Sequence, residues 1–141
     1  MLFLLRFRSF FCCVNDSLKY GPVIGFALFA GKFFSQSYES WLVEFMRVLV
    51  LITMGLVISL QAVKKRNQAY FPFKVVWLSG FNIVIVSSLV SAALLVLMRD
   101  LFFVEPQPLA VGLFIGFYEF IFTEFVGIIV VSIISFTLKK D

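Results

Sequence analysis

The chain has 141 residues, of which 62% are hydrophobic and 14% are charged, and its mean hydropathy is +1.05. Soluble domains average about 45–50% apolar and about 25% charged residues, so this composition excludes a soluble globular protein and indicates an integral membrane protein. The net charge of +4 does not indicate nucleic-acid binding, because the basic residues lie beside apolar runs, where they set membrane orientation. Four spans of about 20 residues would fill nearly all of this length, so we expect no separate soluble domain within it.

Residues 1–17 begin with MLFLLRFRSFFCCV. Arg6 and Arg8 interrupt the apolar run and no small-residue cleavage site follows, so the pattern is not that of a signal peptide. We expect a short interfacial segment whose arginines lie among lipid headgroups; a start site beyond residue 16 is the alternative. Cys12 and Cys13 are adjacent, a spacing that rarely allows a mutual disulfide, so we interpret them as apolar interfacial residues.

Residues 18–141 predict an all-α membrane domain of four transmembrane helices. The expected spans are residues 20–38, 41–63, 74–98 and 109–138. Pro22 would fall in the first turn of the first span, where a missing backbone donor costs little. The last span would be about 45 Å long at about 1.5 Å per residue, so it must tilt, begin outside the hydrocarbon core of about 30 Å, or break. Continuous apolar runs without period-two alternation argue against a β-barrel.

The basic residues gather near the chain ends and between the second and third spans. They are Arg6, Arg8, Lys19, Lys64, Lys65, Arg66, Lys74, Lys139 and Lys140. On the opposite side Arg99 is offset by Asp100 and Glu105. The positive-inside rule therefore places both termini and the 64–74 loop in the cytoplasm. This basic, aromatic loop could also hold anionic lipid or a soluble partner, besides its role as an orientation signal.

Small residues mark packing faces in membrane helices, because lipid provides little hydrophobic drive between helices. At about 100° per residue, each span has a stripe of small residues with a charge on it or nearby. The stripes are Gly21, Gly25 and Lys32; Glu44 and Gly55, with Arg47 close by; Ser88, Ala92 and Arg99; and Gly112, Gly116 and Glu119. We therefore predict a packed bundle with a polar cluster in its non-cytoplasmic half, drawn from Lys32, Glu44, Arg47, Arg99, Asp100, Glu119 and Glu124.

Charges at mid-bilayer cost at least about 2.5–3.5 kcal/mol each on insertion scales, so deep ones are expected to pair. The cluster is then either an ion-pair network that fixes helix register or a site for a headgroup, an ion or a proton. We expect Glu119, on the glycine stripe, to face Lys32 and Arg47 inside the bundle. Glu124 differs from the rest, because it lies about 140° around the helix from Glu119, on an apolar stripe. We expect that the fourth helix is surrounded on two sides, that Glu124 is protonated, or that another subunit supplies its counter-charge.

Catalytic patterns are missing from the sequence. It has no histidine, no G-x-S-x-G elbow, no phosphate loop and no metal-ligand spacing. We therefore predict neither enzymatic activity nor a metal or cofactor.

The order of several segments resembles a known family. LKYGPVIGFAL, AVKKRNQ, AYFPFKVVWLSG, FFVEP and GIIVVSIISFTLKK together resemble the uncharacterised bacterial membrane proteins of domain of unknown function 4199, found mostly in Bacteroidetes. The likeness covers residues 18–140, although many members have a longer segment between the third and fourth spans than EPQPLA. The resemblance implies four spans in a bacterial inner membrane, and it implies no activity.

These features predict a small inner-membrane accessory or assembly subunit without chemistry of its own, with the bilayer and a membrane protein or a second copy as partners. The alternative is a small oligomeric transporter or channel that uses the intramembrane charges.

Overall fold

The computed structural model describes the backbone of residues 2–35, 40–67, 73–102 and 108–138, and the side chains of residues 15, 17–34, 40–65, 73–100 and 108–138. Four long helices make up the fold: α1 (Leu2–Ser35), α2 (Trp41–Asn67), α3 (Phe73–Leu97) and α4 (Leu109–Leu138). A short 3-10 helix, η1 (Arg99–Phe102), follows α3. The predicted all-helical class is confirmed.

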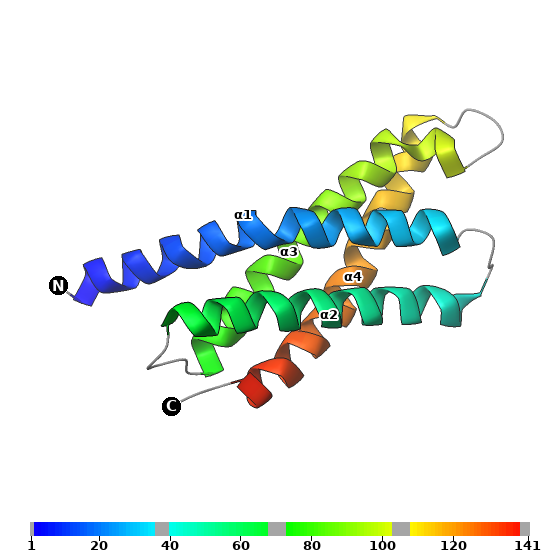
Figure 1. The fold of residues 1–141 in the computed structure, drawn as a ribbon. Helices are drawn as coiled ribbons and strands as arrows, with labels where there is room; N and C mark the ends of the chain where they lie inside the picture. The colour runs from blue at the N-terminus through cyan, green and yellow to red at the C-terminus, as the bar shows by residue number, and fades with distance from the viewer. Residues whose placement is uncertain (1, 36–39, 68–72, 103–107, 139–141) are drawn as a thin grey trace.

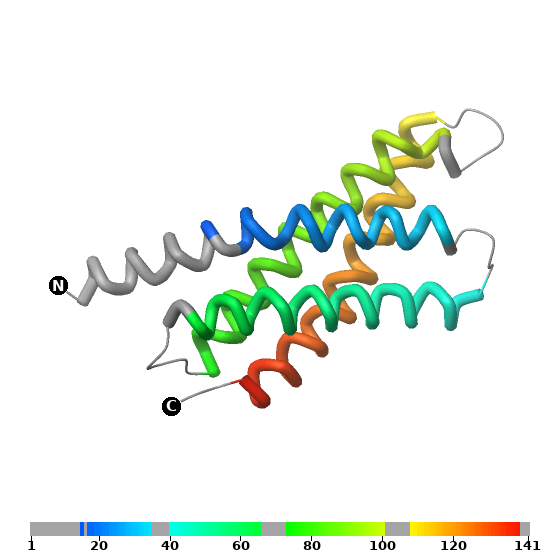
Figure 2. The backbone as a smooth tube through the Cα atoms, in the orientation of Figure 1, coloured from blue at the N-terminus to red at the C-terminus, as the bar shows by residue number. Residues whose placement is uncertain are grey.

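The helices run alternately back and forth, so both termini lie at the same end of the bundle (Figure 1). Figure 2 shows α1 and α2 lying next to each other, with α3 and α4 crossing them as a second pair. Each helix packs against two neighbours: α1 against α2 and α3, and α4 against α3 and α2. The α2 and α3 helices have little mutual contact, so the four helices form a closed ring of neighbours.

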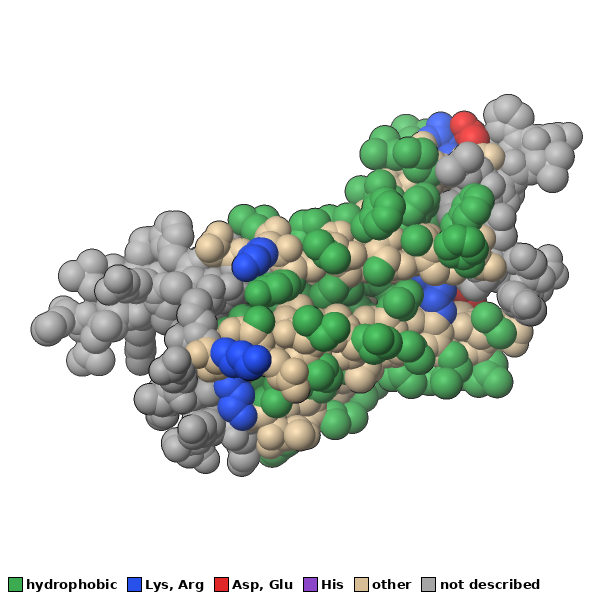
Figure 3. All heavy atoms as spheres, viewed as in Figure 1, with side chains coloured by type: hydrophobic (Ala, Val, Ile, Leu, Met, Phe, Trp, Pro, Cys, Tyr) green, Lys and Arg blue, Asp and Glu red, His purple; other side chains and the backbone are tan. Residues whose placement is uncertain are grey.

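The core consists of aliphatic side chains from all four helices. The buried members are Ile24, Leu28, Val48, Ile52, Leu56, Leu60, Val63, Val76, Ile83, Val84, Val126, Val130, Val131 and Ile134. On α2 they recur every three or four residues, which is the spacing of a single helix face. The outer surfaces of the bundle are also apolar (Figure 3), as a lipid environment requires.

Within the described residues, three helices are long and apolar enough to cross a membrane. They are α2, α3 and α4, with mean hydropathies of 2.1, 2.3 and 2.2. In α1 the apolar stretch between Lys19 and Lys32 also contains Pro22 and three glycines, which lower its hydropathy. The protein is therefore a multi-pass membrane protein by the length and hydropathy of its helices.

The first helix differs from the prediction. We expected a span at residues 20–38 with Pro22 in its first turn, but α1 begins at Leu2 and places Pro22 inside the helix. There is no helical break at residue 17, where the expected interfacial segment ends; its membrane position stays a prediction. Proline removes one backbone donor, a loss that membrane helices tolerate.

The other boundaries lie close to those expected. The α2 helix continues past residue 63 to Asn67, and α3 is displaced by one residue from the expected 74–98. The α4 helix has the predicted bounds and is unbroken, which removes one of the three options for its excess length. It must tilt across the bilayer or extend beyond the hydrocarbon core.

The predicted packing glycines lie against neighbouring helices. A Cβ on Gly21 would lie 2.5 Å from Val86 Cγ1, and one on Gly25 would lie 2.6 Å from the Ser87 carbonyl oxygen. These positions let α1 approach the backbone of α3, which a larger side chain would prevent. Gly55 lies similarly against Ile24, and Gly116 against Val96.

Candidate functional site: an intramembrane ion-pair network

A network of four charged side chains joins three helices near the end of the bundle opposite the termini. Arg47 on α2 lies at its centre: Nη2 donates to Glu119 Oε1 at 3.0 Å, to Glu119 Oε2 at 3.2 Å and to Glu44 Oε2 at 2.9 Å. Lys32 Nζ on α1 lies 3.5 Å from Glu44 Oε2 and 3.7 Å from Glu119 Oε2. Two cations therefore face two carboxylates, and the network has no net charge.

The position of Arg47 depends on the small residue opposite it. Arg47 Cγ and Cδ pass 3.3 Å from the place where a Cβ on Gly31 would lie, so the side chain crosses α1 at that glycine. Its Nη1 then donates to the carbonyl oxygen of Leu28 at 2.8 Å. Among the described residues, Arg47 Nε has no hydrogen-bond partner. The guanidinium thus bonds the backbone of α1 as well as carboxylates on α2 and α4.

The network is buried at its centre and open at one edge. The side chains of Glu119 and Arg47 are 1% and 5% exposed, whereas those of Lys32 and Glu44 are 20% and 29% exposed. A buried pair is desolvated, and loss of one partner leaves a buried charge without compensation. Lys32 and Glu44, by contrast, lie close enough to the surface for their heads to reach a polar environment.

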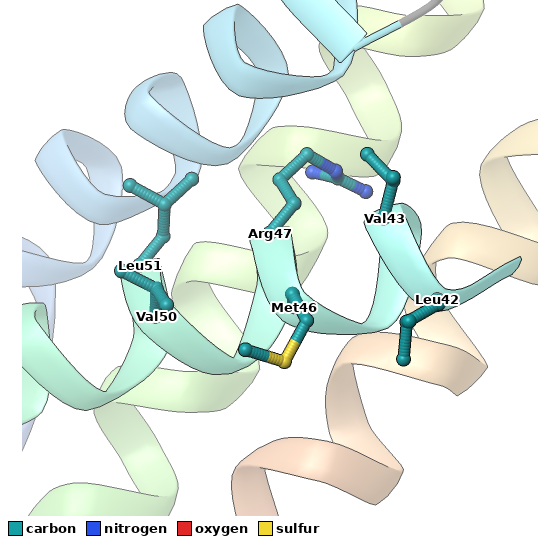
Figure 4. Close-up of a pocket in the computed structure, with 6 residues that line it drawn as sticks. All are labelled: Leu42, Val43, Met46, Arg47, Val50 and Leu51. Carbon is teal, nitrogen blue, oxygen red and sulfur yellow. The ribbon is translucent and has the colours of Figure 1, made fainter. Parts of the chain in front are cut away.

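Outside this network, the surface of α2 forms a shallow apolar groove with a volume of about 450 Å³. It is lined by Leu42, Val43, Met46, Arg47, Val50 and Leu51 (Figure 4). Arg47 is the polar member, yet its guanidinium is engaged with carboxylates and a carbonyl. The groove is suited to an apolar chain and offers no ready polar subsite.

A second groove, of about 370 Å³, lies between α1 and α2 toward the other end. Its lining residues are Lys19, Tyr20, Val23, Ile24, Gly55, Ile58 and Ser59. Lys19 Nζ lies 5.3 Å from the centre of the Tyr20 ring, within the range of a cation–π contact. A lysine at the rim of an apolar groove is typical of a position at the membrane interface.

The basic residues of the predicted cytoplasmic loop lie at the end that carries the termini. Lys65 and Lys74 are exposed and Lys64 is partly exposed. The side chain of Arg66 lies outside the described residues, as do Lys139 and Lys140. Figure 3 shows basic side chains (Lys and Arg, in blue) near this end of the bundle.

Arg99 and Asp100 lie in η1, just after α3. Arg99 Nη1 donates to the Val96 carbonyl oxygen at 2.9 Å, and Arg99 Cδ lies 2.6 Å from a Cβ built on Gly112. Asp100 is exposed. Arg99, a predicted cluster member, thus belongs to the contact between the end of α3 and the start of α4.

Glu124 lies apart from the network, between α3 and α4. Its Oε1 is 2.6 Å from the hydroxyl oxygen of Ser88, and the side chain is half-buried. Its neighbours on the outer side, Phe117, Ile121 and Ile128, are exposed. Glu124 therefore lies at the boundary between the bundle interior and the lipid-facing surface of α4.

Two participants in these sites were missed in the sequence. The sequence places Ser88 on a packing stripe and does not indicate its contact with Glu124. The Leu28 carbonyl has no signature in the sequence, because every residue carries one. Buried hydroxyls at Ser91 and Thr123 also lack a hydrogen-bond partner within the described residues.

The described part of the chain brings together no group of three or more His, Cys, Asp or Glu side chains that could hold a metal ion. By sequence, the chain matches no protein-family model, no curated protein and no solved structure. Its sites are therefore interpreted from their own geometry.

Proposed function

We propose that this chain is a non-catalytic accessory or assembly subunit of a bacterial inner membrane, with four transmembrane helices and both termini in the cytoplasm. The observation that carries the proposal is the ion-pair network of Lys32, Glu44, Arg47 and Glu119. Its central carboxylate, Glu119, is 1% exposed and accepts from Arg47, which also bonds Leu28. Charges that satisfy one another in this way fix the register of three helices.

The topology rests on the distribution of charge and on the alternating helices. Lys64 and Lys65 lie in the last turns of α2 and Lys74 lies in the first turn of α3, and Lys19 shares a groove with Ile58 and Ser59 of α2. The positive-inside rule assigns this end of the bundle to the cytoplasm. The α1 helix packs against both α2 and α3 and serves as the remaining span. The bacterial inner membrane is what the sequence resemblance to the family of unknown function implies. A C-terminal reporter that is active only in the cytoplasm tests this orientation; an inactive reporter on a stable fusion would contradict it.

The outer face of α4 is the surface we propose for a membrane partner. It exposes Phe114, Phe117, Tyr118, Ile121 and Phe125. Aromatic side chains are enriched where proteins associate, and the half-buried Glu124 adds a polar group at the edge of this face. A face that contacts only lipid would need no carboxyl group at its edge, so the position of Glu124 favours a protein partner.

Photo-crosslinking in the native membrane tests the partner surface. A photoreactive amino acid replaces Phe125, which is 66% exposed on α4; the matched control replaces Phe26, which is 61% exposed on α1. We expect a discrete protein adduct from position 125 and lipid adducts from position 26. Lipid adducts alone at both positions, with a monomer in mild detergent, would contradict the proposal.

The alternative is a small oligomeric transporter, and the Glu124–Ser88 contact is the observation that favours it, since polar groups at mid-membrane mark ion pathways. It predicts a flux in vesicles that Glu124→Gln abolishes without lowering protein levels.

A further inference from the structure

The hydroxyl of Ser88 is close to two oxygen atoms at once. Its Oγ lies 2.6 Å from Glu124 Oε1 and 2.9 Å from the carbonyl oxygen of Ile85. A serine hydroxyl has one hydrogen to donate and two lone pairs to accept with. The Ile85 carbonyl is an acceptor only. Both distances are full two-centre hydrogen bonds only if Ser88 donates to Ile85 and Glu124 donates to Ser88, which requires a hydrogen on the carboxyl group of Glu124. One serine hydrogen shared between the two acceptors would give two bent and weaker contacts, and the 2.6 Å contact to Glu124 is at the short end for O–H···O bonds.

The charges around Glu124 do not provide a counter-ion. On α3, the one charged group among the described side chains is Lys74, at its start and 14 residues before Ser88; Arg99 and Asp100 follow in η1. On α4, Glu119 is engaged by Arg47 and Lys32. The remaining described charges on α1 and α2 are Lys19, Glu44, Lys64 and Lys65, and no described cation lies within 4.0 Å of Glu124.

The depth of Glu124 favours the same protonation state. It lies 15 residues after the start of α4 and 14 before its end, so about 21–23 Å of helix extends on either side at about 1.5 Å per residue. This is the middle of the longest apolar helix in the chain. An ionised carboxylate in this position would require water or a cation, and a neutral acid requires neither.

We propose that Glu124 is a proton-binding site. At neutral pH the side chain holds a proton as a carboxylic acid and donates it to Ser88 Oγ, while Ser88 donates to the Ile85 carbonyl. The half-buried carboxyl borders the lipid-facing surface of α4, where a membrane-soluble reagent or a partner can reach it. This inference goes beyond the proposed subunit role and does not depend on it.

Labelling with dicyclohexylcarbodiimide tests the proposal, because this apolar reagent reacts with protonated carboxyl groups inside membranes. The acid O–H adds across a C=N bond: the carboxyl oxygen bonds to the central carbon and the proton goes to nitrogen. The resulting O-acylisourea rearranges to a stable N-acylurea, and nothing is released. The full chain is reconstituted in vesicles of zwitterionic phospholipid, labelled at neutral pH and mapped by mass spectrometry of its peptides.

We expect one adduct, at Glu124, in the unaltered chain and in Glu119→Gln, and none in Glu124→Gln. Labelling should fall by about tenfold per pH unit once the pH exceeds the titration midpoint of the group. An unlabelled Glu124 in the unaltered chain, or equal labelling of Glu119 and Glu124, would overturn the proposal. Peptide mapping of the unaltered chain decides this even if a variant fails to fold.

Infrared spectroscopy provides a second readout that needs no reagent. At neutral pH, the carbonyl stretching band of a protonated carboxyl group should be present in the unaltered chain and in Glu119→Gln, and absent from Glu124→Gln. A spectrum without this band in the unaltered chain means that Glu124 is ionised, and the proposal fails.

Discussion

Arg47 Nη2 lies 3.0 Å from Glu119 Oε1, across a sequence separation of 72 residues. The contact joins α2 to α4, and the same guanidinium reaches α1 through the Leu28 carbonyl. One side chain therefore ties together three of the four helices. In a bilayer, where burial of apolar surface contributes little to helix association, such polar contacts and close backbone packing determine which faces meet.

Replacement of Arg47 by lysine should lower the free energy of unfolding by about 1–3 kcal/mol, although the charge is kept. A single ammonium group cannot serve Glu119, Glu44 and the Leu28 carbonyl in the positions that the guanidinium reaches. The measurement is unfolding in detergent micelles by denaturant titration. Lys65→Arg, on an exposed residue of α2, is the control and should have no measurable effect. An Arg47→Lys variant as stable as the control would mean that the planar geometry of the guanidinium group is unimportant.

Lys32→Met should cost less, about 0–1 kcal/mol, because Lys32 is 20% exposed and its carboxylate contacts are longer, at 3.5 and 3.7 Å. The same titration checks the order of the two effects. If Lys32→Met destabilised the bundle more than Arg47→Lys, the assignment of Arg47 as the centre of the network would be wrong.

Two glycine substitutions should differ sharply. Gly25→Ala places a Cβ 2.6 Å from the Ser87 carbonyl oxygen, a backbone atom, so α1 and α3 must separate at a cost of about 1–3 kcal/mol. Gly112→Ala meets the flexible Arg99 side chain at 2.6 Å, which can move aside, and should be nearly neutral. Unfolding titrations of both variants check this. If Gly25→Ala were as stable as Gly112→Ala, α1 and α3 would not be in close backbone contact at Gly25.

Changes at the Glu124–Ser88 contact should reveal the state of the carboxyl group. A glutamine amide can donate to Ser88 as a neutral acid does, so Glu124→Gln should change stability by less than about 0.5 kcal/mol. Ser88→Ala removes the hydroxyl altogether and should cost about 0.6 kcal/mol, and at most about 1.7 kcal/mol, the average and the maximum measured for hydrogen bonds between membrane helices. Strong destabilisation by Glu124→Gln, measured by the same unfolding titration, would instead indicate an ionised carboxylate with a charged partner.

The sequence predicts the fold well where the apolar pattern has clear boundaries. The fourth helix is bounded by Pro108 and by Lys139, and its predicted limits match those of α4. The first helix is different, because the sequence predicts Pro22 in the first turn of a span, whereas it lies inside α1. A proline inside a helix removes one donor, and the helix continues since residues on both sides favour it.

The site is harder to predict than the helices. Periodicity places Glu119 with Gly116 on one face and predicts that it faces Lys32 and Arg47, and both ion pairs are present. It does not specify which atoms pair, or that Arg47 also bonds the Leu28 carbonyl. That depends on the crossing of the helices, which is set by close contacts such as Gly31 with Arg47. The contact between Ser88 and Glu124 depends in the same way on the crossing of α3 and α4. Local patterns carry no information about these crossings.

The central claim, that the Arg47–Glu119 pair stabilises the bundle, is tested most directly by a double-mutant cycle with Arg47→Met and Glu119→Leu. Each single change leaves one charge buried without its main partner and should cost about 3–5 kcal/mol, whereas the double variant replaces the pair with apolar side chains and should be more stable than either single variant. If the two costs add to within about 0.5 kcal/mol, the residues act independently and the account is contradicted.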